Sequence, residues 1–154
     1  KQERPDLFIT INGGITTLEQ CAEHLKHVDG VMLGREAYHN PWLLSQVDEV
    51  IYGAAPTVRT RESFLDEIEP YIREQLERGA SLHGMVRHLL GIYQFQPGGK
   101  IWRRILSEDS CRPGAGIEVY HQAREAMLKV REQVEEDRAR SAAYHQAQAA
   151  AAAT

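Results

Sequence analysis

The stretch Phe8-Ile9-Thr10-Ile11-Asn12-Gly13-Gly14-Ile15-Thr16 decides how the N-terminal part of this chain folds. An unbroken apolar or β-branched run from Leu7 to Ile11 is typical of a strand that is covered on both faces. Asn12-Gly13-Gly14 follows as a turn in which the backbone adopts φ > 0 and comes close to a ligand. Thr16-Thr17-Leu18-Glu19 fits a capping box, so a helix is predicted with Thr16 as N-cap and Glu19 as its partner.

The predicted helix carries its apolar residues on one stripe, at Leu18, Cys21, Ala22, Leu25 and Val28. Its first turn has free N–H groups and stands directly behind the glycine turn. Such an arrangement suits a bound phosphate.

A second strand and a Gly-Arg pair follow about twenty residues later, as one βαβ unit requires. Asp29-Gly30 ends the helix, Val31-Met32-Leu33 is a short apolar strand, and Gly34-Arg35 stands at its end. In (β/α)8 barrels the loops after strands seven and eight frequently bind a phosphate, and Arg35 would add a charged fork to the anion. The alternative is that the glycines are plain turns and Arg35 is a surface cation. The two motifs together favour the phosphate site.

These motifs resemble the tRNA-dihydrouridine synthases, most closely their A subfamily. The similarity is carried by residues 9–15, 29–42 and 98–108, and it fades after about Val130. The family consists of flavin enzymes with an FMN-carrying barrel followed by a helical RNA-binding domain. The resemblance implies that the FMN phosphate is held by Asn12, Gly13, Gly14, Gly34 and Arg35.

The same resemblance implies the chemistry: a uridine of tRNA is reduced to dihydrouridine by FMN, which NADPH reduces in turn. The target uridine would be flipped out of its stack to reach the flavin. The general acid of the family is a cysteine in the earlier half of the barrel, and neither Cys21 nor Cys111 lies there. We therefore expect no catalytic residue in this chain, which alone would bind tRNA weakly and be inactive.

The length of 154 residues is too short for a whole barrel and a second domain. A complete barrel needs about 250 residues, and the chain does not begin with Met. We expect a C-terminal portion of α/β plus all-α class, in which residues 1–52 form the last βα units of a TIM barrel and a small helical bundle follows. Its two strands would then expose apolar edges.

The remainder of the chain is predicted to be helical. Residues 53–59 are assigned as a linker, residues 60–138 as a helical tRNA-binding domain of four amphipathic helices, and residues 139–154 as a frayed Ala- and Gln-rich tail. Pro70 is expected to kink or split the first of these helices. Gly79 should end that helix, and Ser81 should cap the next one.

Composition limits the classes of partner. A net charge of −4 and a pI near 6.0 mean that any affinity for a polyanion must come from a local patch.

Two cysteines give neither a disulfide framework nor zinc spacing. Cys21 is expected to be buried and Cys111 to be free in a loop. His24 and His27 lack a further ligand, so no metal site is expected. No signal peptide or membrane-spanning run is visible, and we expect a cytoplasmic location with no membrane or protein partner.

A basic face marks the candidate tRNA site. The 30 residues from Arg78 to Ser107 contain no Asp or Glu. At 100° per residue, Lys100, Arg103 and Arg104 share one face of a predicted helix. A solvated face would look similar, but ordinary exposed helices pair their charges, so the absence of Glu favours contact with a phosphate backbone. Family resemblance matches Lys100 and Arg103 to a basic signature that orients tRNA, and we add Arg104 and Arg87 as candidates.

Aromatic residues beside this face have two interpretations. Tyr93, Phe95 and Trp102 would stack on bases in an RNA site, or they would belong to the core, as aromatic residues at such spacings more often do. Trp102 is predicted as core.

Two other functions remain open. A barrel enzyme that binds FMN or a sugar phosphate and acts on a small molecule would keep the phosphate site without the RNA. A non-enzymatic RNA-binding helical module would keep the RNA affinity without any dependence on flavin. Charge reversal of Lys100, Arg103 and Arg104 separates the small-molecule enzyme from the other two.

Overall fold

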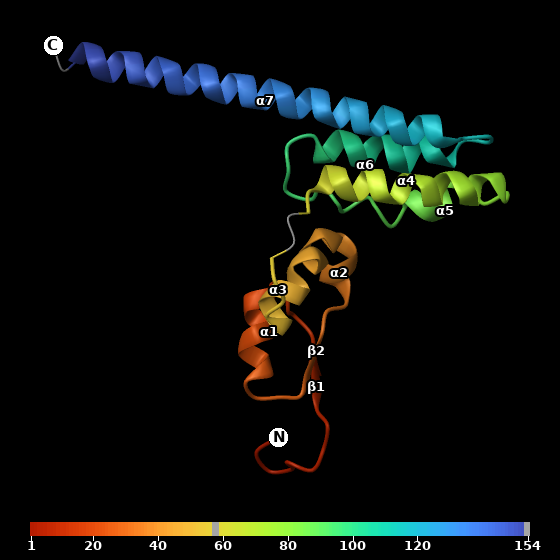
Figure 1. Cartoon of the computed structure of the whole chain (residues 1–154), viewed down its shortest axis with the longest axis vertical. Coiled ribbons are helices and arrows are strands. Elements are labelled where there is room, and N and C mark those ends of the chain that lie inside the picture. Colours follow the sequence, from red (N-terminus) through yellow and green to blue (C-terminus); the bar gives the residue numbers. More distant parts are fainter. Residues whose placement is uncertain (57–58, 153–154) are drawn as a thin grey trace.

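The computed structural model of the chain describes residues 1–56 and 59–152, the last three without their side chains. Residues 57 and 58 of the expected linker and residues 153 and 154 of the expected tail lie outside the described part. Figure 1 shows two units along the chain, an N-terminal unit up to α3 and a helical unit from α4 to α7. Each unit has a hydrophobic core of its own.

The N-terminal unit is built on a parallel pair of strands joined by one helix. Strand β1 (Thr10–Asn12) pairs with β2 (Gly30–Met32), with Ile11 opposite Val31. Helix α1 (Leu18–Leu25) connects them. The strands are shorter and more exposed than predicted: Leu7 and Phe8 lie outside β1, and Phe8 is 79% exposed. The physical reason is that each strand has a single partner in the described chain, so the ladder ends where that pairing ends.

The cap of α1 is one residue later than predicted. Thr17, and not Thr16, is the N-cap, and Gln20 takes the role assigned to Glu19. Thr17 Oγ1 accepts from the Gln20 N–H at 3.2 Å, while Gln20 Oε1 accepts from the N–H groups of Thr16 at 2.8 Å and Thr17 at 3.2 Å. Gln and Glu are interchangeable at the third position of a capping box. Because Gln20 occupies these two donors, the start of α1 offers fewer free N–H groups to an anion than expected.

Three short helices complete the N-terminal unit. They are α2 (Arg35–His39), the 3-10 helix η1 (Pro41–Gln46) and α3 (Val47–Tyr52). Pro41 opens η1 at its first position, and Asn40 makes no side-chain capping bond. The buried core of the unit is small and contains Ile15, Leu18 and Cys21, which confirms that Cys21 is a buried thiol.

The helical unit contains α4 (Arg61–Glu77), α5 (Leu82–Val86), α6 (Gly99–Glu108), the 3-10 turn η2 (Asp109–Cys111) and α7 (Ile117–Ala152). Its core is centred on Trp102, which is fully buried as predicted. The indole lies edge-on to the rings of Tyr93 at 5.5 Å and Tyr120 at 6.0 Å, and its Nε1 donates to the Leu89 carbonyl at 2.9 Å. Tyr93 is therefore a core residue as well.

Pro70 does not split its helix. Helix α4 runs unbroken past it, and Pro70 is exposed. The ring therefore stands on the solvent side, while Leu65 and Ile72 on the inner side are fully buried and hold both halves of the helix to the core. The boundaries that follow are as predicted: Gly79 takes φ +88 after α4, and Ser81 caps α5 by accepting from the Gly84 N–H at 3.2 Å.

The tail predicted to fray is helical. Helix α7 continues to Ala152 and extends well beyond the rest of the unit (Figure 1). Alanine has the highest helix propensity of any residue, and pairs such as Arg140 with Asp137 and Gln148 with Tyr144 support the exposed turns.

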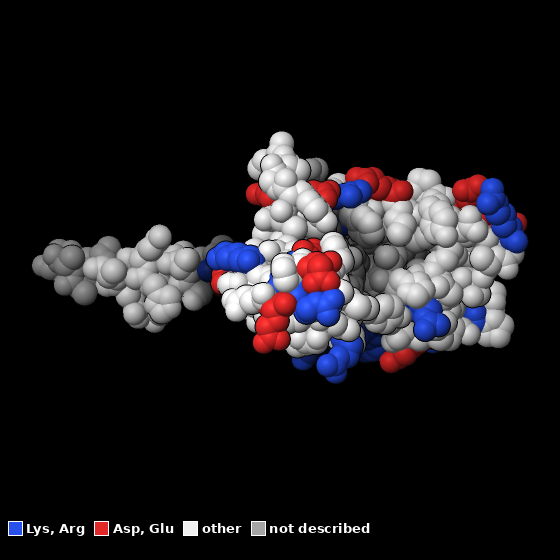
Figure 2. Space-filling view, turned by 90° about the horizontal axis from the view of Figure 1, so that it is seen from below, with Lys and Arg blue, Asp and Glu red and all other residues white. Residues whose placement is uncertain are grey.

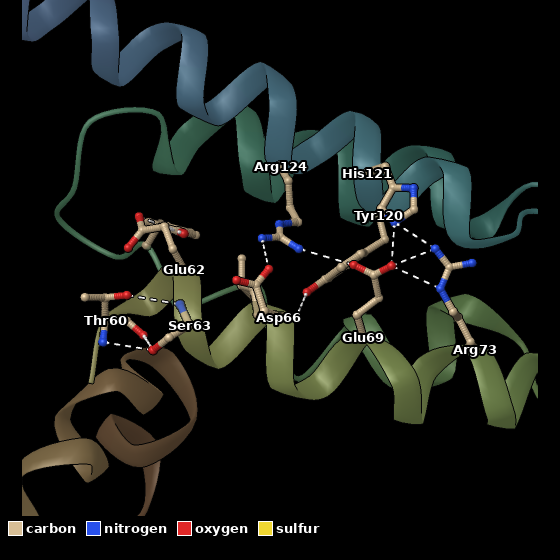
Figure 3. Close-up of polar contacts among 11 residues, drawn as sticks. Thr60, Glu62, Ser63, Asp66, Glu69, Arg73, Tyr120, His121 and Arg124 are labelled. Atoms are coloured by element: carbon tan, nitrogen blue, oxygen red, sulfur yellow. Dashed lines mark hydrogen bonds and ion pairs between the residues drawn. The ribbon is translucent and has the colours of Figure 1, made fainter. Parts of the chain in front are cut away.

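Ion pairs join α4 to α7 across the outer side of the helical unit (Figure 3). Glu69 of α4 bonds to His121 Nε2 at 2.9 Å and to Arg124 Nη1 at 3.3 Å, and Asp66 accepts from Arg124 Nη2 at 2.5 Å. Beneath them the Tyr120 hydroxyl donates to the Leu65 carbonyl at 2.8 Å.

Over the described residues, no helix combines the length and apolarity needed to cross a bilayer.

Candidate functional site

A cavity of about 470 Å³ opens where β1 and β2 end. Parallel strands place their carboxyl ends at one sheet edge, so the turn after each strand contributes to the same hollow. The cavity is lined by Asn12, Gly13, Gly14, Ile15, Thr16, Met32, Gly34, Arg35, Glu36 and His39. All five residues predicted to hold a phosphate therefore lie around one cavity.

The glycines make this cavity a cradle for a small anion. Gly13 and Gly14 take φ +114 and +70, a region that other residues avoid. A Cβ built on Gly13, Gly14 or Gly34 would meet no atom within 4 Å, so these backbones face open space that a side chain would fill. Arg35 is exposed, and no carboxylate of the described chain lies within 4 Å of its guanidinium. The backbone approach and the free cation fit a phosphate group, as FMN carries.

A second hollow lies between the two units. It encloses about 290 Å³ and is lined by Tyr38, His39, Arg87, Leu90, Gly91, Gln94 and Arg103. We call it the junction groove. His39 lines both this groove and the phosphate cavity, so the two hollows adjoin at one side chain. The Tyr38 ring stands edge-on to the His88 ring at 5.8 Å across the junction.

Four basic side chains stand free on this side of the helical unit. Arg87, Lys100, Arg103 and Arg104 are exposed, and within the described ranges none has a carboxylate within 4 Å. Several other cations are paired, such as Arg73 with Glu69 and Arg78 with Glu74. Figure 2, seen from below, shows Lys and Arg mostly over the lower half of the view, with acidic side chains along the upper edge and also among these cations. The predicted basic face is therefore available to an anionic partner.

The two units are locked together beside these hollows. Arg61, at the start of α4, stacks over the Trp42 ring at 4.7 Å and donates from Nε to the Ile92 carbonyl at 2.7 Å. Burial lowers the pKa of Arg61. At Gly91 a Cβ would stand 2.2 Å from the His39 carbonyl oxygen, so only glycine allows this contact. The phosphate cavity and the basic face thus have a fixed relation.

Comparison with known proteins identifies the family to which the chain belongs. The family profile described as "Dihydrouridine synthase (Dus)" matches residues 1–128. This chain belongs to the dihydrouridine synthase family. The resemblance inferred from the motifs, to the A subfamily, is confirmed by relatives named tRNA-dihydrouridine(20/20a) synthase. That of Vibrio vulnificus is 48% identical over 123 residues, 80% of this chain and 38% of the relative. That of Shewanella oneidensis is 50% identical over 119 residues, 77% of this chain and 36% of the relative.

The chain therefore spans less than two-fifths of the length of these dihydrouridine synthases. The remaining three-fifths of such an enzyme has no counterpart among the residues described here.

Sequence reasoning missed several residues that line the two hollows. Tyr38 and His39 line the junction groove and Glu36 lines the cavity. The sequence carried a signal for His39, because it lies four positions after Arg35. A helix that begins at Arg35 places both side chains on one face. Gln94, whose Oε1 accepts from Arg103 Nη2, carried no signal, since its place depends on how the two units pack.

The remaining sequence candidates, Cys111 and the pair His24 and His27, do not line either hollow. Cys111 is free and exposed, and its thiol donates to the Ser107 carbonyl at 3.1 Å. In the described part of the chain no cluster of three potential metal ligands includes His24 or His27.

Proposed function

We propose that this chain is the C-terminal part of an FMN-dependent tRNA-dihydrouridine synthase. The enzyme reduces uridines of tRNA, at positions 20 and 20a as the names of its relatives state, with NADPH as reductant of the flavin. The observation that carries the proposal is that the phosphate cavity adjoins the junction groove at His39, and that two residues of the basic face, Arg87 and Arg103, line this groove. A tRNA-modifying enzyme works where tRNA is found, so we place it in the cytoplasm.

The residues of this chain bind and position. Asn12, Gly13 and Gly14 bring the backbone to the FMN phosphate, and Arg35 and Gly34 approach it from the second turn. Bound FMN supplies the hydride for uridine reduction. None of the catalytic acid–base work is assigned to this chain.

The helical unit contacts the tRNA backbone in this proposal. Lys100, Arg103 and Arg104 of α6, with Arg87 beside them, neutralise phosphates and release counterions. Such contacts position the RNA and carry no base preference of their own. The base preference must come from other side chains or from the barrel.

Charge reversal tests the tRNA contact. Arg103→Glu should weaken binding of a fluorescein-labelled tRNA transcript by roughly tenfold or more at moderate salt, and it should lower the slope of log affinity against log salt by about 1 or more. Arg138→Glu is the matched control, because Arg138 is an exposed α7 cation with no ion pair in the described chain. The control should change affinity less than twofold. Equal effects of both variants would refute a specific basic face.

A further inference from the structure

Phe95 holds an unusual backbone conformation. Its φ is +61, and among the described residues it is the one non-glycine residue with positive φ. It occupies the third position of a four-residue turn that closes with Gln96 N–H donating to the Tyr93 carbonyl at 3.1 Å. Turns that need φ > 0 at this position favour Gly or Asn. A bulky aromatic residue here stores strain, and strain of this kind concentrates at functional sites.

The Phe95 side chain gains no packing in the core that would offset the strain of its backbone. The Phe95 ring is 84% exposed, the highest value among the large hydrophobic residues described. The turn beneath it is rigid, because Tyr93 is buried and a Cβ on Gly99 would stand 2.1 Å from the Tyr93 carbonyl oxygen. A fixed scaffold therefore presents an aromatic ring to solvent, and the ring stabilises nothing in the chain itself.

The ring stands among hollows that the proposed function already uses. It lines a hollow of about 330 Å³ at the junction, together with Gln94, Gln96 and Arg61. Thr16 is shared by this hollow and the phosphate cavity, and Gln94 is shared with the junction groove. Amides and cations beside an exposed ring suit a nucleobase, which offers a π face to the ring and polar edges to the amides.

We propose that Phe95 is a base-stacking residue that receives an unpaired nucleobase of the bound RNA. The proposal rests on the function proposed above and adds to it an aromatic platform beside the phosphate contacts. Because the turn is fixed before binding, stacking costs little conformational entropy. The side chains of Gln94 and Gln96 lie on either side of it in the sequence and reach the edges of the same base or its neighbour.

The test uses the whole chain and the same labelled tRNA transcript. Phe95→Ala and Phe95→Gly should weaken binding by roughly five- to 150-fold, with the salt slope unchanged because no phosphate contact is lost. Phe95→Gly should leave the melting temperature unchanged or higher, since glycine relieves the strain. Phe95→Tyr should retain most of the affinity. In Phe95→Trp, tRNA should quench emission beyond that seen from Trp42 and Trp102 in the unaltered chain.

The outcomes separate the two proposals. If the unaltered chain binds the transcript and Phe95→Gly binds as well, the stacking role is overturned while the basic face stands. If Phe95→Gly lowered the melting temperature, the Phe95 ring would stabilise the fold, and its proposed stacking role would also be overturned. If the unaltered chain fails to bind the transcript, both proposals fail.

Discussion

Arg61 connects the N-terminal unit to the helical unit through two contacts of its side chain. Its guanidinium contacts the Trp42 ring in one unit and the Ile92 carbonyl in the other. A planar guanidinium meets both demands, since it stacks on an aromatic face while its N–H groups donate in the plane. A lysine ammonium, as a compact charge, cannot do both at once.

Replacing Arg61 by Lys should therefore destabilise the chain by about 2 kcal/mol, the sum of a stacked cation and a bond from a charged donor. Urea unfolding followed by tryptophan emission measures this, because Trp42 reports the junction directly. Arg78→Lys is the matched control: Arg78 pairs with Glu74 at the surface, and the change should cost less than about 1 kcal/mol. If both variants lowered the free energy of unfolding by the same amount, Arg61 would not be the residue that joins the two units.

At the scale of single residues, the sequence predicted well where local backbone chemistry decides. Gly79 and Ser81 take their predicted places because caps and turns depend on a few neighbours. The prediction placed the N-cap of α1 one residue too early. Thr16 and Thr17 fit the capping pattern equally well, and only the packing of Leu18 distinguishes them. Gln94 and Tyr38 were beyond prediction, because they meet across units far apart in the sequence.

At the scale of elements, α4 and α7 are joined by charge as well as by the core. Glu69 accepts hydrogen bonds from His121 and Arg73, and these lower the pKa of its carboxyl (Figure 3). A carboxyl whose pKa is lower in the folded chain than in the unfolded one stabilises the fold above its unfolded value, about 4.3. The stabilisation is lost as the pH falls through the folded value.

Glu69→Gln should accordingly lower the free energy of unfolding by about 1 kcal/mol at pH 7. The difference from the unaltered chain should shrink as the pH falls from the unfolded pKa through the lower folded one, because Glu69 then becomes protonated in both states. Urea unfolding at a series of pH values measures it. Glu125→Gln, which breaks an exposed pair with Lys129 on α7 alone, should change stability little at any pH. A constant Glu69→Gln effect across the series would refute the ionic origin.

Element lengths were the least predictable feature. Helix α7 is longer than predicted because alanine propensity outweighs the absence of a core-forming face. The strands are shorter because strand length depends on partners, which a sequence pattern does not supply. Helix α4 is unbroken because Pro70 faces solvent, a fact that requires knowing which side of the helix meets the core.

At the scale of the whole molecule, the N-terminal unit exposes surface that a closed barrel would cover. Leu7, Phe8 and Met32 are exposed beside a sheet of two strands. Unpaired strand edges with apolar neighbours promote association between copies. The βαβ unit was predictable from its apolar strands and glycine turns, whereas the relation of the two units was not.

Phe8→Ser should therefore reduce self-association of the chain and leave its melting temperature nearly unchanged, because Phe8 is 79% exposed and contributes little buried area. Light scattering against concentration, with the melting temperature measured alongside, checks this. Phe64→Ser is the contrasting variant: Phe64 packs against the core of the helical unit, so it should lower the melting temperature. Unaltered association of Phe8→Ser would show that the sheet edge is not the contact.

The most direct test joins this chain to the upstream three-fifths of the Vibrio vulnificus relative and measures dihydrouridine in tRNA. The substrate is tRNA from a strain without dihydrouridine synthases, with FMN and NADPH supplied. We predict dihydrouridine at positions 20 and 20a, and much less when Arg35→Ala weakens the hold on FMN or Arg103→Glu weakens the hold on tRNA. A chimera that folds, binds FMN and binds tRNA, yet leaves every uridine unreduced, would contradict the assignment of this chain as the C-terminal part of such an enzyme.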